Sequence, residues 1–221
     1  MEKIYYHHFH KCAGSSIVSW LTREYGVPGV NSNGNLIDKF GVAYPLHLYS
    51  DSELNSFLLE YSEANWLAYE WGLPSLGIIN QHRYTATVIR EPRERLLSNY
   101  IYDYTNGSTR LKLSEYIRNV SIPFWYHEFY HCEVLRNREK QLPSNDVSQV
   151  KQYLLDSFDE IWLLKENKFF LVRGEGVLKG ALSNNKNKRR VRFYKKPSID
   201  VKLDDYCVKD TQLFESLLSL C

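Results

Sequence analysis

The stretch IYYHHFHKCAGSSIVSWLTREY, residues 4–25, predicts a strand, a turn and a helix in that order. The aromatic, β-prone run from Ile4 to Phe9 favours a buried strand. From Ser15 to Tyr25 the apolar side chains recur at helical spacing, and Gly26 is a suitable residue to end that helix. The turn from His10 to Gly14 therefore joins the end of a strand to the start of a helix.

Strand and helix patterns alternate along the rest of the chain. Further strands are predicted at Asn65–Tyr69, Tyr84–Ile89 and Glu160–Leu164. Helices are predicted from Ser50, where Ser50 and Glu53 form a capping box, from Pro92, and over residues 113–120, 124–136, 145–158 and 204–220. This alternation predicts a single α/β domain over residues 1–221, with a mostly parallel sheet flanked by helices on both faces. Ligands of such sheets bind at the carboxyl ends of the strands.

Composition narrows the class of protein. A chain of 221 residues that is 43% hydrophobic can bury a sizeable core, which excludes a disordered protein. No run of about 18 apolar residues is present, so no membrane span is expected. The first residues lack the pattern of a signal peptide, and the four cysteines are scattered without a metal-knuckle spacing. A cytoplasmic location is therefore predicted.

The basic charge is concentrated in one run. The net charge is +2, but KNKRRVRFYKK at residues 186–196 holds seven basic residues, and without it 21 basic residues face 26 acidic ones, a net charge of −5. Such a run is either a solvated loop or an anion site, and both interpretations stay open. No nucleic-acid partner is predicted.

The turn after the first strand has the features of an anion site. Small residues from Ala13 to Ser16 let a phosphate approach the backbone, and the helix start offers unpaired N–H groups and a positive dipole end. Lys11 adds a mobile cation. It is not a Walker A loop, because Lys11 precedes Gly14 rather than following the glycines. A cysteine phosphatase loop is also excluded, since it requires an arginine where Val18 stands.

A second anion site is predicted at residues 88–100, which read VIREPRERLLSNY and again give a strand, a turn and a helix. The guanidinium of Arg90 can form paired hydrogen bonds with phosphate oxygens, and Ser98 can add a hydroxyl. The alternative is an ordinary charged helix start in which the acidic residues pair with the basic ones: Glu91, Glu94, Arg93 and Arg95.

Together the two motifs resemble a known family. HFHKCAGSS at residues 8–16 resembles the 5′-phosphosulfate loop of sulfotransferases that use 3′-phosphoadenosine 5′-phosphosulfate (PAPS), and it is closest to the branch that modifies heparan and chondroitin. Residues 89–100 are similar to that family's 3′-phosphate motif, R-[DE]-P-x-x-R-x-x-S-x-Y. Residues 159–166 give a weaker match. His10 stands where the family usually has proline, and Glu91 replaces the commoner aspartate.

The resemblance implies a P-loop-like core and a sulfuryl transfer from PAPS to a hydroxyl, of a sugar or a small molecule, by in-line displacement. Lys11 would stabilise the charge that develops on the leaving group. No metal is expected, because a sulfuryl group carries less charge than a phosphoryl group. The implied donor-binding residues are Lys11, Ala13, Gly14, Ser15, Ser16, Arg90 and Ser98, with Lys188, Arg189 and Arg190 on a loop that could close over the nucleotide or attract an anionic acceptor.

The acceptor hydroxyl also requires a base. The resemblance implies a histidine or glutamate after the second core strand, where residues 66–72 read WLAYEWG and Glu70 is the titratable carboxylate. Its aromatic neighbours are expected to raise its pKa, which suits a base. The alternative is an ordinary glutamate at a strand end, and His82 and His8 are the reserve candidates.

Two other functions stay open at this point. His127, Glu128 and His131 form an H-E-x-x-H pattern, which on a helix could bind zinc and make the protein a metallopeptidase. No histidine follows His131, so the third ligand would be a carboxylate such as Glu160 or Glu166. A nucleotide- or anion-binding module without catalysis would keep both anion sites and lack a base.

Overall fold

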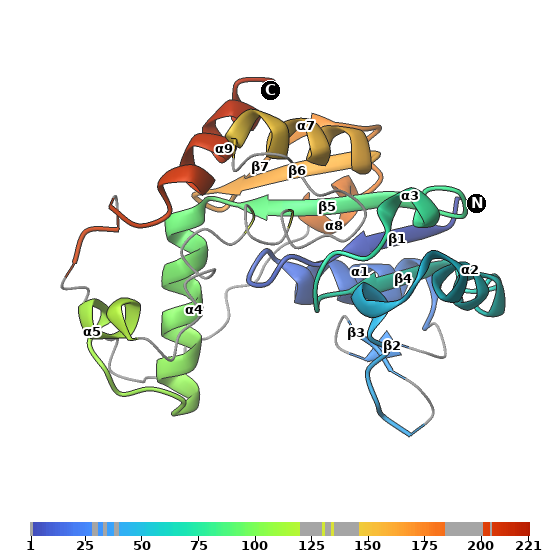
Figure 1. Cartoon of the computed structure of the whole chain (residues 1–221), viewed down its shortest axis with the longest axis horizontal. Helices are drawn as coiled ribbons and strands as arrows, with labels where there is room; N and C mark the ends of the chain where they lie inside the picture. Colours follow the sequence, from blue (N-terminus) through green and yellow to red (C-terminus); the bar gives the residue numbers. More distant parts are fainter. Residues whose placement is uncertain are drawn as a thin grey trace.

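The computed structural model describes residues 2–27, 31–32, 35–37, 40–119, 130, 134, 146–183, 201–203 and 205–221. The described chain is an α/β fold around one five-stranded sheet (Figure 1). In spatial order the strands are β4 (Trp66–Tyr69), β1 (Ile4–His7), β5 (Tyr84–Arg90), β6 (Glu160–Lys165) and β7 (Lys168–Arg173). All neighbouring pairs are parallel except β6 and β7. The mostly parallel sheet predicted from the sequence is thus confirmed.

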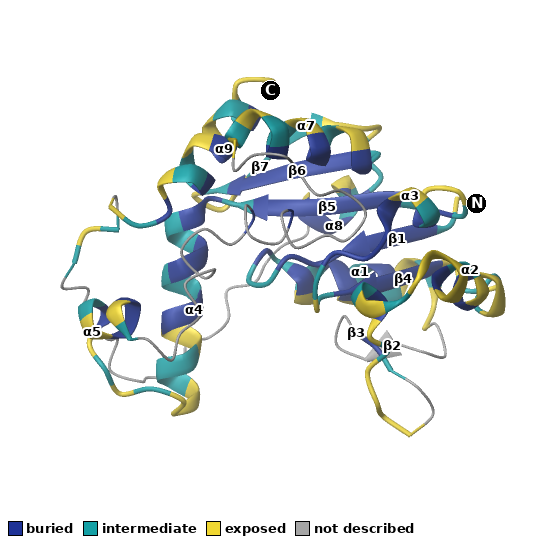
Figure 2. Cartoon of the chain, viewed as in Figure 1, coloured by how far each residue is buried: buried dark blue, intermediate teal, exposed yellow. Residues whose placement is uncertain are grey.

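Strand β1 is the centre of the core. All four of its residues are buried, as expected for a strand covered on both faces. His7 lies opposite Tyr69 of β4 and Thr87 of β5, and the Thr87 hydroxyl donates to the His7 carbonyl over 2.9 Å. Figure 2 shows the buried residues following the sheet, with most exposed ones on the outer helix faces and loops.

Helices flank this sheet in two packed pairs, α1 with α8 and α7 with α9. The connections from β1 to β4 and from β5 to β6 run in opposite directions. Because such crossovers are almost always right-handed, α1 and α7 are expected on opposite faces. The helices are α1 (Gly14–Tyr25), α2 (Asp51–Glu60), α3 (Leu76–Ile79), α4 (Pro92–Asn106), α5 (Leu113–Arg118), α7 (Val147–Ser157), α8 (Lys179–Ser183) and α9 (Val208–Leu218), with a 3-10 turn at Leu46–Leu48 and a small hairpin of β2 (Asn31–Ser32) and β3 (Asn35–Leu36).

The strand order changes direction between β1 and β5. Counted along the chain, the order of the five strands is 2-1-3-4-5, in which the chain leaves β1 toward one edge and β5 toward the other. The loops after these two adjacent strands therefore diverge, and ligands of doubly wound sheets bind at this point. Helix α4 runs across the carboxyl ends of the strands (Figure 1).

Helix α4 is fixed at its outer part by a second, smaller core. Asn99 and Asp103 of α4 both bond the Tyr116 hydroxyl of α5, at 2.9 and 2.6 Å. The buried residues of this core are Leu96, Tyr100, Leu113, Tyr116, Ile117 and Cys207. This packing holds α4 in place where it extends beyond the sheet.

One local prediction is confirmed, and other elements differ from expectation. The predicted capping box of Ser50 and Glu53 is present at the start of α2. Strand β7 was not predicted, because its hairpin turn is made by Glu166 and Asn167 at φ 51 and 60°, and this pair lacks the glycine that usually marks such a turn. The helix predicted at 124–136 lies outside the described residues except for Tyr130 and Val134, which are helical and buried. Among the helices in the described ranges, none is long and apolar enough to cross a membrane.

Candidate functional site

The loop between β1 and α1 has an unusual backbone. Lys11 and Ala13 both have positive φ, 65 and 63°, which is uncommon for residues other than glycine and is often found at functional sites. The N–H groups of Ser16 and Ile17 both bond the Ala13 carbonyl, so the helix begins there. The N-cap residue of this helix, Ala13, makes no side-chain hydrogen bond to the helix start. The N–H groups of Gly14 and Ser15, the first two of α1, have no acceptor within the helix, which is the condition for binding an anion.

The His8 ring leaves no room for a side chain at Gly14, the residue that follows this loop. A Cβ atom on Gly14 would lie 1.9 to 2.2 Å from three atoms of the His8 ring, so only glycine fits beneath the imidazole. His8 is buried, and its Nδ1 has no hydrogen-bond partner among the described residues. Burial lowers the pKa of His8 to about 4, the nearby Glu70 opposes that shift, and His10 and Lys11 add to it. His8 is therefore neutral near pH 7.

Glu70 lies beside the same loop, immediately after β4. The backbone N–H of His8 donates to the Tyr69 carbonyl over 2.9 Å, which fixes the end of β4 against the end of β1. One oxygen of Glu70 lies 2.6 Å from Nδ1 of His10, and the other lies 3.7 Å from Nδ1 of His8. The structure thus brings Glu70 to the predicted edge, as the middle member of a cluster with two histidines.

Lys11 links the loop to α4. Its Nζ lies 3.2 Å from the centre of the Tyr102 ring, a cation–π contact. Because Tyr102 belongs to the helix that follows β5, this contact joins the elements that carry the two sequence motifs. The role of Lys11 toward a leaving group stays a prediction.

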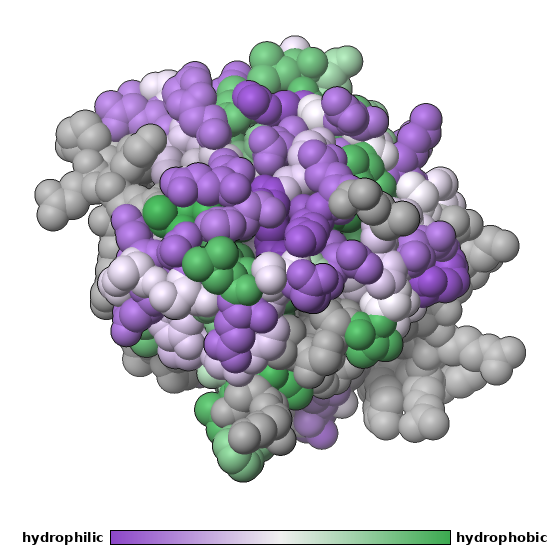
Figure 3. Space-filling model, turned by 90° about the vertical axis from the view of Figure 1, so that its right-hand side faces the viewer, coloured by the Kyte–Doolittle hydropathy of each residue, from purple (hydrophilic) through white to green (hydrophobic). Residues whose placement is uncertain are grey.

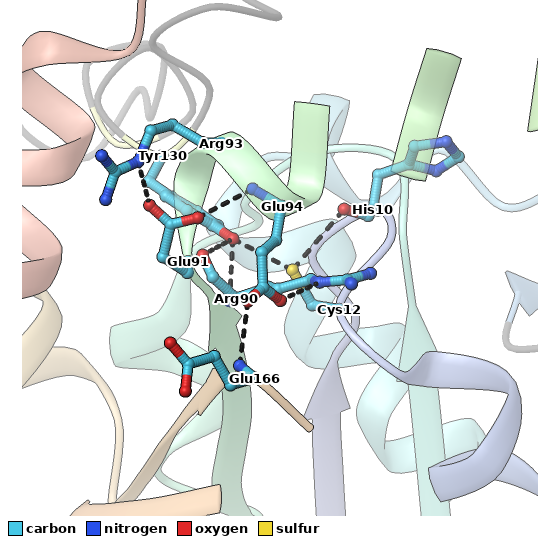
Figure 4. Close-up of polar contacts among 8 residues, drawn as sticks. All are labelled: His10, Cys12, Arg90, Glu91, Arg93, Glu94, Tyr130 and Glu166. Carbon is cyan, nitrogen blue, oxygen red and sulfur yellow. Dashed lines mark hydrogen bonds and ion pairs between the residues drawn. The ribbon is translucent and has the colours of Figure 1, made fainter. Parts of the chain in front are cut away.

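Arg90 ends β5, and the start of α4 is a network of paired charges (Figure 4). Glu91 caps the helix by accepting from the Glu94 N–H over 2.8 Å, and its other oxygen pairs with Arg93 at 2.6 Å. Glu94 pairs with Nε of Arg90 at 3.2 Å. The alternative of an internally paired helix start is therefore correct for Glu91 and Arg93. Arg95 is fully buried, 6.0 Å from the centre of the Tyr130 ring.

Tyr130 connects the two loops. Its hydroxyl accepts from the Arg90 N–H over 2.8 Å and donates to the Arg90 carbonyl over 2.7 Å. The Sγ atom of Cys12 lies 3.1 Å from the same hydroxyl. Burial raises the pKa of Tyr130 well above its usual range, so the hydroxyl keeps its proton. The phenol holds the ends of β1 and β5 at a fixed separation.

Some of the remaining predicted site residues lie within the described ranges, and others lie outside them. Ser15 is exposed and Ser16 half-buried at the start of α1, and Ser98 is half-buried on α4. The predicted basic residues Lys188, Arg189 and Arg190 lie outside the described residues, as does the whole run 186–196. His127, Glu128 and His131 of the zinc pattern lie outside them too, and within the described ranges no group of three or more potential ligands could hold a metal.

His82, a reserve base, is not at this site. It bonds the Asn55 side chain over 2.8 Å and precedes β5, so it lies at the amino end of the strands. The seven residues of β5 separate the two ends by roughly 20 Å. A cavity of about 320 Å³ opens at that opposite edge, on the mostly polar face seen in Figure 3, lined by Glu2, Lys3, Asn80, His82, Arg83, Tyr84 and Asp159.

Sequence reasoning missed two residues of this site. His10 was noted only as a replacement for proline, and Tyr130 lay within a predicted helix with no role assigned. A histidine three residues after β1 and a glutamate directly after the neighbouring β4 could have signalled the first pair, because the ends of parallel neighbours meet.

When the chain is compared with protein-family models, curated proteins and solved structures, none of them matches.

Proposed function

We propose that the protein is a sulfotransferase that moves a sulfuryl group from PAPS to an acceptor hydroxyl of a sugar or another small molecule. The observation that carries this proposal is the meeting of two anion-type loops at the carboxyl ends of adjacent strands. Cys12 of the first loop and Arg90 of the second contact one hydroxyl, that of Tyr130. Their sequences resemble the two donor-binding motifs of PAPS-dependent sulfotransferases, in the same order.

The first loop would hold the 5′-phosphosulfate. The N–H groups of Gly14 and Ser15 at the start of α1 and the hydroxyls of Ser15 and Ser16 are suitable donors for sulfuryl and phosphate oxygens. Gly14 leaves no side chain between the helix start and the His8 ring. Lys11 would stabilise the negative charge that develops on the bridging oxygen when the bond to sulfur breaks.

The second loop would hold the 3′-phosphate. Arg90 has its guanidinium half-exposed, and its backbone is held on both sides by the Tyr130 hydroxyl. A phosphate would compete with Glu94 for this guanidinium, and the dianion is the stronger partner because it offers more charge and more acceptor oxygens. We assign Ser98 the second bond to the same phosphate.

Catalysis is favoured over simple binding by the cluster around Glu70. A non-catalytic anion-binding module needs no proton acceptor near its phosphate loop. Here a carboxylate contacts one histidine of that loop and lies near a second. A buried or isolated Glu70 would have favoured the binding module instead.

Calorimetric titration tests the donor site without knowledge of the acceptor. Adenosine 3′,5′-bisphosphate, the product of PAPS, is expected to bind at least tenfold more tightly than adenosine 5′-phosphate. The reason is that charged hydrogen bonds from Arg90 and Ser98 contribute about 1.5 to 3 kcal/mol each. Equal affinity for the two nucleotides would contradict the proposal.

A further inference from the structure

The contact between His10 and Glu70 defines an acid–base pair at the edge of the proposed site. Nδ1 of His10 lies 2.6 Å from a Glu70 oxygen, a distance typical of a charge-assisted hydrogen bond. A carboxylate accepts only, so Nδ1 carries the hydrogen in this contact. The neutral ring then has its lone pair on Nε2. This arrangement is that of a histidine base held in one tautomer by a carboxylate.

We infer that His10 is the proton acceptor for the incoming hydroxyl and that Glu70 positions it. This inference rests on the proposed sulfuryl transfer and changes the role that the sequence suggested for Glu70. The exposed fractions of the side chains decide between them: 34% for His10, 16% for Glu70 and 9% for His8. The imidazole of His10 thus faces solvent, where an acceptor arrives, and the carboxylate lies behind it.

The chemistry of the two groups favours the same assignment. Imidazoles as a class titrate roughly two pH units above carboxylates, so an imidazole is the better base near neutral pH. When the imidazole takes a proton, the adjacent carboxylate stabilises the positive charge. Figure 4 shows the His10 ring pointing away from the Arg90–Glu94 pair, while its carbonyl faces Cys12 at 3.5 Å. The loop that would bind the donor therefore also fixes the backbone of the base.

The other histidines near the sequence motifs do not suit this role. The His8 ring lies against Gly14, and burial lowers its pKa to about 4, which makes it a poor proton acceptor at neutral pH. His82 lies at the opposite edge of the sheet. Of these candidates, His10 alone combines exposure with a carboxylate partner at the carboxyl edge.

In the proposed sulfuryl transfer, one bond to sulfur forms and one breaks. The acceptor oxygen forms a new bond to sulfur, and the bond from sulfur to the bridging oxygen breaks. The electron pair of the broken bond stays on the 5′-phosphate of the departing nucleotide, where Lys11 would meet the charge. The acceptor proton moves to Nε2 of His10 and later to water. No oxidant, reductant or metal takes part in this balance.

The experiment combines one spectroscopic and one kinetic readout. Long-range ¹H–¹⁵N NMR on the full chain at alkaline pH is expected to show the His10 hydrogen on Nδ1. In Glu70→Ala the hydrogen should redistribute between the two nitrogens, because the acceptor is gone. A wild-type ring with its hydrogen on Nε2 would overturn the inference regardless of any activity.

The kinetic readout is PAPS turnover, with water or a panel of saccharides and phenols as acceptors, followed as release of adenosine 3′,5′-bisphosphate. His10→Asn keeps a donor toward Glu70 but has no basic nitrogen, so turnover should fall by about a hundred- to ten-thousandfold. Added imidazole should partly restore His10→Ala, a rescue that a purely structural role would not give. His82→Asn is the matched control and should turn over like the wild type.

The outcomes separate this inference from the proposed function. If the wild type binds adenosine 3′,5′-bisphosphate and turns over PAPS, but His10→Asn is equally fast, only the role of His10 is overturned, and Glu70 is the next residue to replace. If the wild type neither binds that nucleotide nor turns over PAPS, the proposed function fails. Equal nucleotide affinity of His10→Asn and the wild type is required for the kinetic comparison, and a large loss of affinity would show that His10 is part of the donor site instead.

Discussion

The two loops that follow β1 and β5 meet at one edge of the sheet, yet their internal chemistry is opposite. The loop before α1 has two non-glycine residues at positive φ, and it leads into a helix start where the N–H groups of Gly14 and Ser15 have no acceptor within the helix. The start of α4 is satisfied from within, since Glu91 caps the helix and pairs with Arg93, while Glu94 pairs with Arg90. One loop therefore presents donors, and the other must release a guanidinium before it can bind a ligand.

This difference has a consequence for a ligand with two anionic groups. A phosphosulfate at the first loop would gain hydrogen bonds from the N–H groups of Gly14 and Ser15, which have no acceptor within the helix. A 3′-phosphate at the second loop must replace the Arg90–Glu94 ion pair, which is partly exposed and so contributes little by itself. The first site should supply most of the affinity and the second most of the selectivity for a 3′-phosphate. The predictions below test this division.

The largest effect is expected from Lys11→Ala. The charge that Lys11 meets develops in the transition state, so turnover of PAPS should fall by about a hundredfold or more. Nucleotide binding should survive in part, because the N–H groups of α1 and Arg90 remain. Steady-state kinetics with PAPS and calorimetry with adenosine 3′,5′-bisphosphate measure the two quantities. Lys179→Ala, at an exposed position of α8, is the control. A proportionate loss of both quantities in Lys11→Ala would show a binding role only.

Arg90→Ala should weaken binding of adenosine 3′,5′-bisphosphate by roughly 10- to 100-fold, because a charged hydrogen bond to phosphate is lost. Binding of adenosine 5′-phosphate should change little, since that nucleotide has no 3′-phosphate. The matched control is Arg93→Ala, whose guanidinium pairs with Glu91 on the same helix start. If both nucleotides weaken equally, Arg90 acts through general electrostatics and the division between the loops is wrong.

Gly14→Ala should lower the free energy of unfolding by about 1 to 3 kcal/mol, since the new methyl group would overlap the His8 ring. Urea denaturation measures this loss. His8→Ala removes the ring, so adding Gly14→Ala to that variant should cost much less than it costs the wild type. Equal costs in the two backgrounds would mean that the overlap is relieved elsewhere.

Much of the fold was predictable, because it depends on local patterns. The first strand and helix were predicted to within two residues of β1 and one residue of α1 at their ends. Their meeting with β5 followed from the alternation of strands and helices. The site itself depends on pairs distant in sequence: His10 and Glu70 are 60 residues apart, and Cys12 and Tyr130 are 118 apart. Local patterns do not specify such pairs unless the order of the strands is known as well.

The charges at the start of α4 show the same limit at short range. Glu94 was expected to pair with one of the arginines of its own helix, and it pairs with Arg90 of the preceding strand instead. The spacing of four residues allows that pair even though Arg90 is not helical. Arg95 could not serve, because the core covers it completely. The sequence does not show that Arg95 is buried, and this burial leaves Arg90 as the partner of Glu94.

The pH dependence of stability should report the buried His8. Its pKa is about 4 in the folded chain, against 6.5 when unfolded, so only the unfolded chain takes up this proton between those values. The free energy of unfolding should therefore fall as the pH drops below about 6.5, by up to about 1.4 kcal/mol per pH unit for this histidine, and the loss should level off near pH 4. In His8→Gln the slope should be shallower by that amount. An unchanged slope would mean that His8 takes up its proton while folded, with Glu70, His10 and Lys11 as the charged groups around it.

The smallest expected effect is the sharpest test of the contrast between the loops. Glu94→Gln keeps the shape of the side chain and an oxygen for the Glu166 N–H, but it removes the charge that holds Arg90. A partly exposed ion pair of this spacing contributes about 0.3 to 0.5 kcal/mol. Adenosine 3′,5′-bisphosphate should then bind about twofold more tightly, because Arg90 no longer has to leave a partner. Glu63→Gln makes the same charge change at an exposed position after α2, and it measures the general electrostatic contribution. Unchanged or weaker binding in Glu94→Gln, relative to that control, would show that the ion pair does not restrain Arg90 and that both loops are equally ready for an anion.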